Sequence, residues 1–400
     1  GKLPLKRLFL DITATRETAR HTGIERVACA LTRQLLQQPP AGFRAEPVYL
    51  SFNGGRWHVR YAKQFTSQLL QLSACILFDD VVEPQAGDVY VALDLASAPF
   101  VQASLAGVFE HWQKRGVSTH AVVYDLLPVN LPEVFPPGAD KVHTEWLHAI
   151  SKLDSALCIS KSVKSDLAAW QAAHPSPTPA RRKPRLHAFE LGADSLPQIT
   201  ANDEAHNLSD VLGHALTGTT FLSVGTLEPR KNFAQALWAF EVLWAQNIDV
   251  NWVLVGREGW QGLPEAQRQD IASLMAHIQT HPEHHKRFFW LNDVDDAQLS
   301  QLYAHADCLL NPSLGEGFGL PLIEAAHHGL PLLLRDLPVF QEVAGHNATY
   351  FSAHTAEDLA AAIEQWLQKP STLKHTSQHL RSVTWADSTA QILNHLGLVA

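Results

Sequence analysis

Short apolar runs alternate with longer amphipathic segments along most of the chain. Residues 7–12 (RLFLDI) form a β-rich apolar run, and residues 24–37 then carry isoleucine, valine and leucine on one helical stripe. The alternation continues through the first half. It predicts further strands at 46–52, 56–61, 88–95, 119–126, 155–160 and 185–191, and helices at 101–115, 141–153 and 163–173. Strands that alternate with helices favour a parallel sheet with right-handed crossovers.

The alternation stops at residues 193–218, which are polar and aperiodic, and then begins again. The second series predicts strands at 220–225, 250–256, 287–291, 307–311 and 330–334, and helices at 232–246, 264–279, 296–305, 321–328 and 356–368. We interpret residues 193–218 as a linker. The predicted fold class is α/β, with two doubly wound, Rossmann-like domains whose strand carboxyl ends line a cleft between them.

Domain bounds follow from this pattern. We expect residues 1–195 to form the first domain, residues 196–370 the second, and residues 371–400 a helical segment that crosses back to the first. A length of 400 residues agrees with two or three domains.

Composition and charge exclude several classes of protein. The chain has 31 Lys and Arg against 40 Asp and Glu, a net charge of −9, which argues against a partner that is a nucleic acid. No apolar run approaches the ~20 residues of a membrane span. With no export signal in view we expect a cytoplasmic protein, and a peripheral membrane contact stays open. The four cysteines lack CxxC spacing, which favours reduced thiols over disulfides or a thiolate zinc site.

A basic pair follows the first strand of the second series. Arg230 and Lys231 stand in the stretch VGTLEPRKN, between that strand and the helix predicted from Asn232 onward. A planar guanidinium, an ammonium and the free N–H groups of a helix start together make a site for a diphosphate. A solvated basic pair at a helix start is the alternative, and these residues alone do not decide between the two.

A glycine-rich stretch with two glutamates follows the strand at 307–311. Its sequence, GEGFGLPLIE, holds three glycines in five positions, which lets the backbone approach a ligand closely. Pro321 suits the first position of a helix, so Glu316 lies in the loop and Glu324 in the first turns of the helix. One carboxylate can then meet sugar hydroxyls and the other the two hydroxyls of a ribose. The alternative is an ordinary loop with two exposed acids.

Together these motifs resemble the donor domain of the retaining, nucleotide-sugar-dependent glycosyltransferases of the GT-B fold, family four. Two glutamates separated by seven residues mark that family, and Glu316 and Glu324 have this spacing. The stretch VGTLEPRKN resembles the family's phosphate-binding Arg-Lys segment, and residues 304–331 match its most characteristic block. The resemblance is strong over residues 220–350 and weaker over residues 1–195.

The resemblance implies roles for residues of the second half. Arg230 and Lys231 would hold the donor diphosphate, Glu316 would contact the transferred sugar, and Glu324 would bind the ribose. The base would lie near Gly256, Arg257 and Val294, and the donor site would be completed by Gly225, Gly317, Phe318, Gly319 and Leu320. No metal and no other cofactor is implied.

The first half supplies fewer signals. His21, Gly23 and Arg26 follow the first strand, where the family has a glycine-containing loop near the donor phosphates. Gly23 fits a donor contact, and His21 and Arg26 are candidates for the acceptor side. A helix entry capped by Thr22 is the alternative for the two side chains.

Tyr124 and Asp125 close the strand predicted at 119–126. Many relatives have His-Asp here, so a catalytic histidine cannot be carried over to Tyr124. Asp125 is a candidate for catalysis and for contact with the acceptor or sugar, and it equally suits local amide bonding, as Asp does in turns. Tyr124 and Glu133 are further candidates for acceptor contact.

Two other clusters are interpreted as structural. The stretch DVDD at 293–296 resembles a metal-binding Asp-x-Asp, but Asp295 or Asp296 suits the N-cap of the next helix. Four histidines at 277–285 lie in a polar stretch and are interpreted as a hydrated surface, because zinc needs convergent ligands.

The favoured function is retaining transfer of a hexose from a nucleotide diphosphate sugar to a growing glycan in bacterial surface polysaccharide synthesis. The stretches VGTLEPRKN, TGIERV and YDLLP are most similar to mannosyl- and rhamnosyltransferases. GDP-mannose is the favoured donor, and UDP- and dTDP-sugars stay open. A lipid-linked glycan acceptor would bring the protein to the inner face of the cytoplasmic membrane. The alternatives are a catalytically degenerate scaffold that binds glycan or a partner, and a sugar phosphorylase or epimerase.

Overall fold

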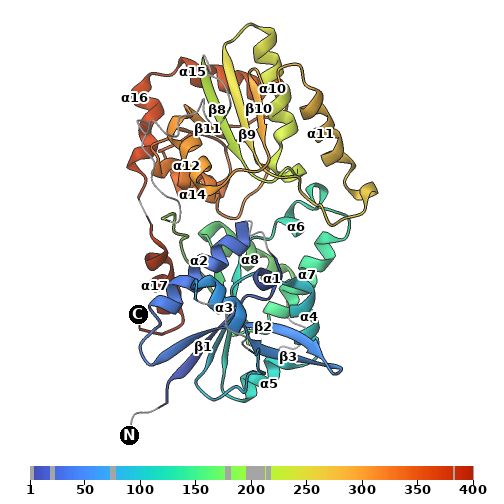
Figure 1. Cartoon of the computed structure of the whole chain (residues 1–400), viewed down its shortest axis with the longest axis vertical. Helices are drawn as coiled ribbons and strands as arrows, with labels where there is room; N and C mark the ends of the chain where they lie inside the picture. The colour runs from blue at the N-terminus through green and yellow to red at the C-terminus, as the bar shows by residue number, and fades with distance from the viewer. Residues whose placement is uncertain are drawn as a thin grey trace. The chain divides into compact units, whose positions relative to one another are not determined.

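Two compact units make up the chain, and each is built on its own sheet (Figure 1). The computed structural model describes residues 4–18, 23–72, 78–175, 182–194, 212, 218–381 and 383–399. The first unit comprises Gly1–Asn130, Gly138–Gly192 and Val383–Ala400, and the second comprises Leu131–Pro137 and Ala193–Ser382. The predicted linker at 193–218 lies almost wholly outside the described residues.

The sheet of the first unit has seven strands in the order β3-β2-β1-β4-β5-β6-β7. These are β1 (Lys6–Asp11), β2 (Phe43–Asn53), β3 (Arg56–Tyr61), β4 (Val89–Ala92), β5 (Ser118–Val123), β6 (Ser155–Cys158) and β7 (Arg185–Ala188). Neighbouring strands are parallel except β2 and β3, which form an antiparallel hairpin. The strands predicted at 46–52 and 56–61 are therefore confirmed.

The helices of the first unit include the predicted ones, one of them broken in two, and three short helices that were not predicted. They are α1 (Thr13–Glu17), α2 (Gly23–Gln37), α3 (Lys63–Leu69), α4 (Ser97–Leu105), α5 (Val108–Lys114), α6 (Leu127–Asn130), α7 (Ala139–Ile150), α8 (Lys161–Ala173) and α17 (Trp385–His395). The three that were not predicted are α1, α3 and α6. The single helix predicted at 101–115 is wrong. Gly107 adopts φ +84°, in the left-handed region that glycine enters without strain, and this ends α4 and starts α5.

The sheet of the second unit has six strands, all parallel, in the order β10-β9-β8-β11-β12-β13. These are β8 (Thr219–Val224), β9 (Val250–Val255), β10 (Phe288–Leu291), β11 (Cys308–Asn311), β12 (Leu332–Arg335) and β13 (Thr349–Phe351). The α-helices are α10 (Phe233–Ala245), α11 (Gln269–Thr280), α12 (Asp296–His305), α13 (Leu320–His327), α14 (Pro338–Ala344), α15 (Ala356–Gln368) and α16 (Ser371–Lys374). The 3₁₀ turns are η1 (Pro132–Val134), η3 (Pro229–Lys231), η4 (Glu265–Gln267) and η5 (His375–His379).

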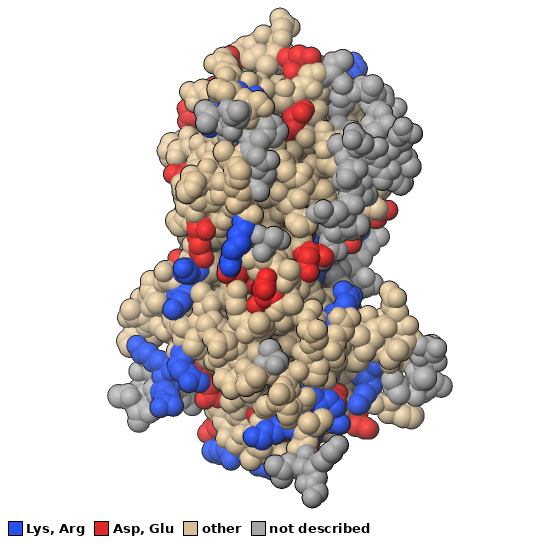
Figure 2. Space-filling view, turned by 90° about the vertical axis from the view of Figure 1, so that its left-hand side faces the viewer, with Lys and Arg blue, Asp and Glu red and all other residues tan. Residues whose placement is uncertain are grey.

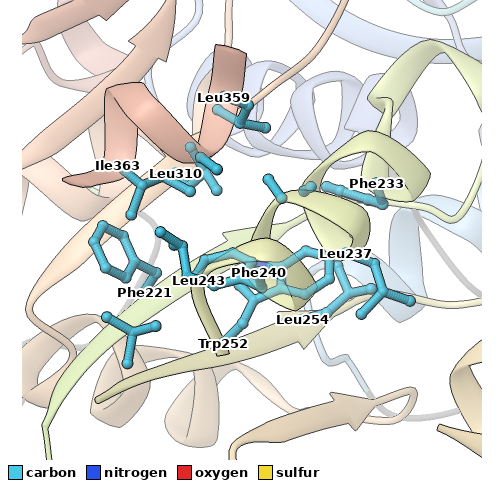
Figure 3. Close-up of a cluster of buried hydrophobic side chains, with 14 of the residues drawn as sticks. Phe221, Phe233, Leu237, Phe240, Leu243, Trp252, Leu254, Leu310, Leu359 and Ile363 are labelled. Carbon is cyan, nitrogen blue, oxygen red and sulfur yellow. The ribbon is translucent and has the colours of Figure 1, made fainter. Parts of the chain in front are cut away.

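Both faces of this second sheet are covered by apolar side chains. Along β8, Phe221 belongs to one buried cluster and Leu222 to another, because successive side chains of a strand point to opposite faces. Figure 3 shows the first cluster, in which Trp252 of β9 and Phe240 of α10 lie near Leu359 and Ile363 of α15. The second cluster takes residues from α12, α13 and α14. A sheet buried on both faces explains why these strands have near-continuous apolar sequences.

The structure also describes the lengths of the helices, the charges on the surface and the cysteines. None of the described helices is long and apolar enough to cross a bilayer. Acidic and basic side chains are interspersed on the face that Figure 2 draws. Cys29, Cys158 and Cys308 are buried, and burial raises the pKa of the Cys29 thiol to about 11 and that of the Cys158 thiol to about 12. Cys75 lies outside the described residues.

Candidate active site

The strand order of the second unit has a topological switch point between β8 and β11. The chain continues from β8 to β9 on one side of this point and from β11 to β12 on the other. Open α/β sheets bind ligands at such points, outside the strand carboxyl ends. Residues 225–232 and 312–319 leave β8 and β11 at this edge, so the two motifs found in the sequence meet here.

Arg230, Lys231 and Glu316 form a hydrogen-bonded cluster at the switch point. Lys231 Nζ donates to Glu316 Oε1 at 2.6 Å, and Arg230 Nη1 lies 3.0 Å from Glu316 Oε2. Ser313 Oγ donates to Glu316 Oε1 at 2.8 Å. The Lys231 and Glu316 side chains are 11% and 9% exposed. The structure thus brings three predicted catalytic residues into direct contact.

Arg230 also ties the two loops to each other. Its Nη1 donates to the carbonyl of Gly315 at 3.0 Å, and its Nη2 donates to Glu228 Oε1 at 2.9 Å. Its own carbonyl accepts from the Leu314 amide at 2.9 Å. A guanidinium suits this place because its planar fork presents several N–H donors in fixed directions.

Charge pairing sets the ionisation of this cluster. Burial by itself would raise the pKa of Glu316, but the charges of Lys231 and Arg230, with hydrogen bonds from Lys231 and Ser313, lower it to about 2. Burial lowers the pKa of the Lys231 ammonium, against the attraction of Glu316. Glu316 is therefore a fixed anion that holds two cations at the edge of the sheet.

Arg335 supports this cluster and was not predicted from the sequence. Arg335, at the end of β12, is buried and donates from Nε to the Pro312 carbonyl at 3.0 Å. Its Nη1 donates to the Ala353 carbonyl and its Nη2 to Gln235 Oε1, each at 2.7 Å. It therefore fixes the start of the loop that carries Glu316. Its one sequence signal is a charged residue that ends the apolar run LLL.

The backbone at Gly225 passes close to the buried Lys231 side chain. Gly225 directly follows β8, and a Cβ there would lie 3.0 Å from Lys231 Cε. Gly319 is the N-cap of α13, whose first residue is Leu320, and Phe318 is buried beside it. Of the first residues of α13, Pro321 has no N–H group and the Leu322 amide donates to the Gly319 carbonyl at 3.0 Å, so this helix start leaves few donors for an anion.

Glu324 lies in a different environment from Glu316. It is 2% exposed, and its Oε2 accepts from the Tyr303 hydroxyl of α12 at 3.2 Å. The carboxylate thus lies between α12 and α13, and its role toward a ribose stays a prediction. Arg257 and Val294 follow β9 and β10. Arg257 pairs with Asp293 at 3.2 Å near the surface, and Val294 is half-buried.

The candidates of the first unit have local partners. Tyr124 is buried, and its hydroxyl donates to the Leu93 carbonyl at 2.7 Å, so while that bond holds this oxygen can only accept a hydrogen bond from a sugar. Asp125 Oδ1 accepts from the Leu127 amide at 3.0 Å, which is the local role left open as an alternative. Gly23 is exposed at the start of α2 and Arg26 is half-buried one turn later.

Two further acceptor candidates lie elsewhere. Glu133 is exposed in η1, a segment that clusters with the second unit although the sequence placed it in the first domain. His21, and the alternative cap Thr22, lie outside the described residues.

The histidines at 277–285 converge more than the sequence analysis expected. His277 Nε2 and His281 Nε2 lie 2.9 Å and 2.7 Å from the same oxygen, Glu241 Oε1. His281 Nδ1 accepts the Glu283 amide at 3.1 Å, so the neutral ring carries its proton on Nε2 and donates it to Glu241. A metal needs that nitrogen deprotonated, so these contacts describe a hydrogen-bonded group. The expected cap is confirmed, because Asp295 forms a capping box with Gln298 at α12.

Comparison with known sequences identifies the second unit with one family. Residues 205–382 match the family model described as glycosyl transferases group 1. The chain is 33% identical over 397 residues to the serotype-specific mannosyltransferase WbdA of Escherichia coli, a match that covers 99% of this chain and 45% of the relative. It is 28% identical over 260 residues to the O-antigen chain mannosyltransferase RfbU of Salmonella typhimurium, covering 64% and 63% of the two chains. The chain spans about half the length of the WbdA relatives it matches.

Solved structures with the same fold cover nearly the whole chain. The sucrose-phosphate synthase of Thermosynechococcus elongatus matches with a TM-score of 0.67 and 16% identity, over 98% of each chain. The HepE protein of Anabaena, in complex with UDP and glucose, matches with a TM-score of 0.66 and 16% identity, over 98% of this chain and 99% of HepE. The fold is therefore the two-domain α/β fold of the GT-B glycosyltransferases, as the sequence predicted.

Proposed function

The chain belongs to the group 1 glycosyl transferases, and from this premise we propose that it transfers a hexose from a nucleotide diphosphate sugar to a growing glycan, with retention of the anomeric configuration. Mannose is the proposed sugar and GDP-mannose the proposed donor. Support comes from a mannosyltransferase similar along 99% of this chain. We infer that no metal is required, because Arg230 and Lys231 would supply the positive charge that a leaving diphosphate needs.

The observation that carries the proposal is the cluster of Arg230, Lys231 and Glu316. Two cations from the loop after β8 meet one carboxylate from the loop after β11. An ammonium has three N–H donors, and Glu316 takes one of them through its Oε1. A diphosphate beside this cluster would meet preorganised positive charge, and a sugar attached to it would meet the Glu316 carboxylate.

In the proposed mechanism the bond between the anomeric carbon and the diphosphate oxygen breaks while the acceptor oxygen attacks from the same face. The acceptor hydroxyl gives its proton to the departing diphosphate oxygen. Negative charge develops on that leaving group, and Arg230 and Lys231 would stabilise it. Preorganised contacts of this kind are each worth about 10²–10³ in rate.

The proposed acceptor is a glycan of bacterial surface polysaccharide, carried on a lipid. Support comes from relatives whose names specify O-antigen chain mannosyltransferases. Such an acceptor would place the reaction at the inner face of the cytoplasmic membrane, with the protein in peripheral contact. Co-sedimentation with vesicles of anionic lipid tests that contact separately from turnover.

The proposal is tested by measuring mannose transfer from GDP-mannose with wild type and with Lys231→Met. Methionine keeps most of the apolar stem and removes the charge. At saturating donor we expect kcat to fall by about 10²-fold, because the leaving group loses one cation. Proton NMR of the wild-type product should show the anomeric configuration of the donor.

Lys369→Met is the matched control, because Lys369 lies in the same unit and its Nζ donates to Thr349 Oγ1 of β13 at 2.9 Å. Its turnover should match the wild type. Normal kcat in Lys231→Met would overturn the role given to the cluster. Donor binding without turnover in the wild type would favour a degenerate scaffold, and transfer to inorganic phosphate alone would favour a phosphorylase.

A further inference from the structure

A groove of about 460 Å³ lies between α10 and α11 of the second unit. Its lining comes from residues 228–238, which include η3 and the start of α10, and from residues 270–277 of α11. Binding pockets for small ligands have volumes of about 300–1,000 Å³. The groove is therefore large enough for one or two sugar rings, and nothing in the mechanism above uses it.

The lining of this groove combines an exposed indole with carboxylates. Trp238 lines it and is 59% exposed, although a tryptophan on a surface helix normally buries most of its ring. Phe233 and Leu274 add apolar surface, and Glu228 and Asp270 add carboxylates. Among the described residues that line the groove, none is lysine or arginine.

Charge narrows the class of ligand. Two carboxylates and no lining cation disfavour a nucleotide or any other phosphate ligand, because like charges repel at short range. A sugar is neutral, and it presents an apolar face of C–H groups on one side and hydroxyl donors at its edge. An indole can cover the first, and carboxylate oxygens can accept from the second.

The groove adjoins the cluster of Arg230, Lys231 and Glu316. Glu228 lines the groove, and its Oε1 accepts from Arg230 Nη2 at 2.9 Å. Arg230 in turn lies 3.0 Å from Glu316. Glu228 therefore links the groove to the cluster through Arg230, so a long glycan that ends at the site of transfer could extend into the groove.

We propose that the groove between α10 and α11 binds sugar residues of the growing glycan, some positions back from the residue that receives the new hexose. The inference rests on the proposed function for its choice of a glycan. Trp238 stacks on the apolar face of one residue, and Glu228 and Asp270 accept from its hydroxyls. Such a subsite holds long acceptors and is out of reach of short ones.

The test compares α-mannobiose and α-mannotetraose as acceptors for wild type and Trp238→Ala. For the tetraose we expect the KM of the variant to rise by about three- to tenfold, the effect of losing one aromatic stacking contact. The kcat, the KM for GDP-mannose and the KM for the biose should stay at wild-type values. Trp238→Phe should restore most of the affinity, which a merely structural role would not require.

Phe52→Ala is the matched control, because Phe52 is 57% exposed on β2 of the first unit. It should leave the KM for both acceptors unchanged. An equal rise of KM for biose and tetraose in Trp238→Ala would overturn the proposal. The same holds if Phe52→Ala has the same effect as Trp238→Ala.

A second measurement does not need turnover. Saturation-transfer NMR with free α-mannotetraose should show contact in wild type and a weaker signal in Trp238→Ala. If wild type transfers no mannose, the proposed function fails, and this titration alone decides the groove. A tetraose signal equal in the two proteins would overturn the subsite. Loss of the tetraose signal on addition of tetramethylammonium would also overturn it, because the groove would then be a site for a cation.

Discussion

Two buried carboxylates in this protein ionise in opposite ways because their partners differ. Glu316 has two cations beside it, which lower its pKa to about 2. Asp94, just after β4, is 4% exposed and accepts from the amide and hydroxyl of Thr15 at 2.8 Å and 2.7 Å. Burial, with the charge of Asp11 nearby, raises the pKa of Asp94 to about 7. Burial raises the pKa of both carboxyl groups, so the difference between them comes from the two cations beside Glu316.

Asp11 is the second acid of this pair. It ends β1, is 3% exposed, and accepts from the amide and hydroxyl of Thr13 at 2.9 Å and 2.5 Å and from the Tyr90 hydroxyl. Burial raises its pKa too. Asp11 and Asp94 follow neighbouring strands at the switch point of the first sheet, where they anchor α1.

We predict that Asp94→Asn makes the stability of the first unit depend less on pH. The pKa of Asp94 rises from 3.8 to about 7 on folding. Its contribution is therefore fully present below about pH 4 and is lost as the pH rises toward 7, where the unfolded chain has already released the proton. Asparagine does not titrate, and its oxygen can still accept from Thr15. The Tm of the variant minus the Tm of the wild type should therefore increase from pH 4.5 to pH 8.

Asp154→Asn controls for the substitution itself. Asp154 Oδ2 accepts from the amide and hydroxyl of Thr119 at 2.8 Å and 3.1 Å, the same pair of bonds, but Asp154 is only half-buried. The prediction is contradicted if both variants change with pH in the same way, or if the Asp94→Asn difference is constant from pH 4.5 to 8.

At the scale of elements, α17 shows how the chain closes the first unit. Its Ser388 hydroxyl donates to the Glu190 carbonyl at 2.6 Å, and His395 Nε2 lies 2.8 Å from the Ala188 carbonyl. The helix thus docks on the end of β7 and on the segment that follows it, and Figure 1 shows it near α2. Thr384 starts it with a capping box, accepting from the Asp387 amide at 3.1 Å.

We predict that Thr384→Ala destabilises the first unit by about 1 kcal/mol and leaves the second unchanged. Loss of an N-cap oxygen leaves an amide of the first turn without its partner, and such changes cost about 0.5–2 kcal/mol. Hydrogen exchange followed by mass spectrometry reports each unit separately. Faster exchange should appear in α17 and α2.

The chain supplies a matched control in the other unit. Thr355 forms the same capping box with Asp358 at the start of α15. Thr355→Ala should speed exchange in the second unit only. If Thr384→Ala accelerates exchange equally in both units, then α17 does not stabilise the first unit alone, and the prediction is contradicted.

Most elements of this fold could be predicted from sequence because parallel strands and amphipathic helices have strong periods. The failures have local causes. The break at Gly107 depends on one backbone angle, and the short elements α14 and β13, between 338 and 351, are too brief to show a period. The 3₁₀ turn η4 shortens the helix predicted at 264–279, which begins at Gln269.

The candidate site also contains some residues that could be predicted from the sequence and others that could not. Arg230, Lys231 and Glu316 could be predicted, because they stand in motifs whose residue types indicate contact with a phosphate or a sugar. The structure brings these three side chains together. Ser313 and Arg335 could not be found, because their importance lies in contacts between segments 23 or more residues apart or within a loop of unpredicted shape. The buried bond of Tyr124 to Leu93 likewise joins residues 31 positions apart.

At the scale of the whole molecule, each unit has its own sheet and its own buried side chains. Those of the second unit line both faces of its sheet, and Figure 3 shows the cluster on one of these faces. The cluster of Arg230, Lys231 and Glu316 lies entirely in that unit. Two cores of this kind can unfold in separate steps, and a ligand of one unit stabilises only the step in which its site is lost.

We therefore predict that one nucleoside diphosphate raises the unfolding temperature of the second unit only. GDP, UDP, dTDP, ADP and CMP are compared by thermal unfolding, with hydrogen exchange to assign each transition. At 100 times its Kd a ligand adds about 2.7 kcal/mol, a shift of several degrees for a unit of this size. GDP is the expected ligand, because GDP-mannose is the proposed donor.

Arg230→Ala should abolish the shift, since it removes the guanidinium that joins both loops of the site. Arg287→Ala is the control, because Arg287 pairs with Glu283 at 3.1 Å in the same unit but away from the switch point. A GDP shift that survives in Arg230→Ala would place the nucleotide elsewhere. A shift with UDP alone would keep the site and change the donor, so the same experiment separates the position of the site from the identity of its base.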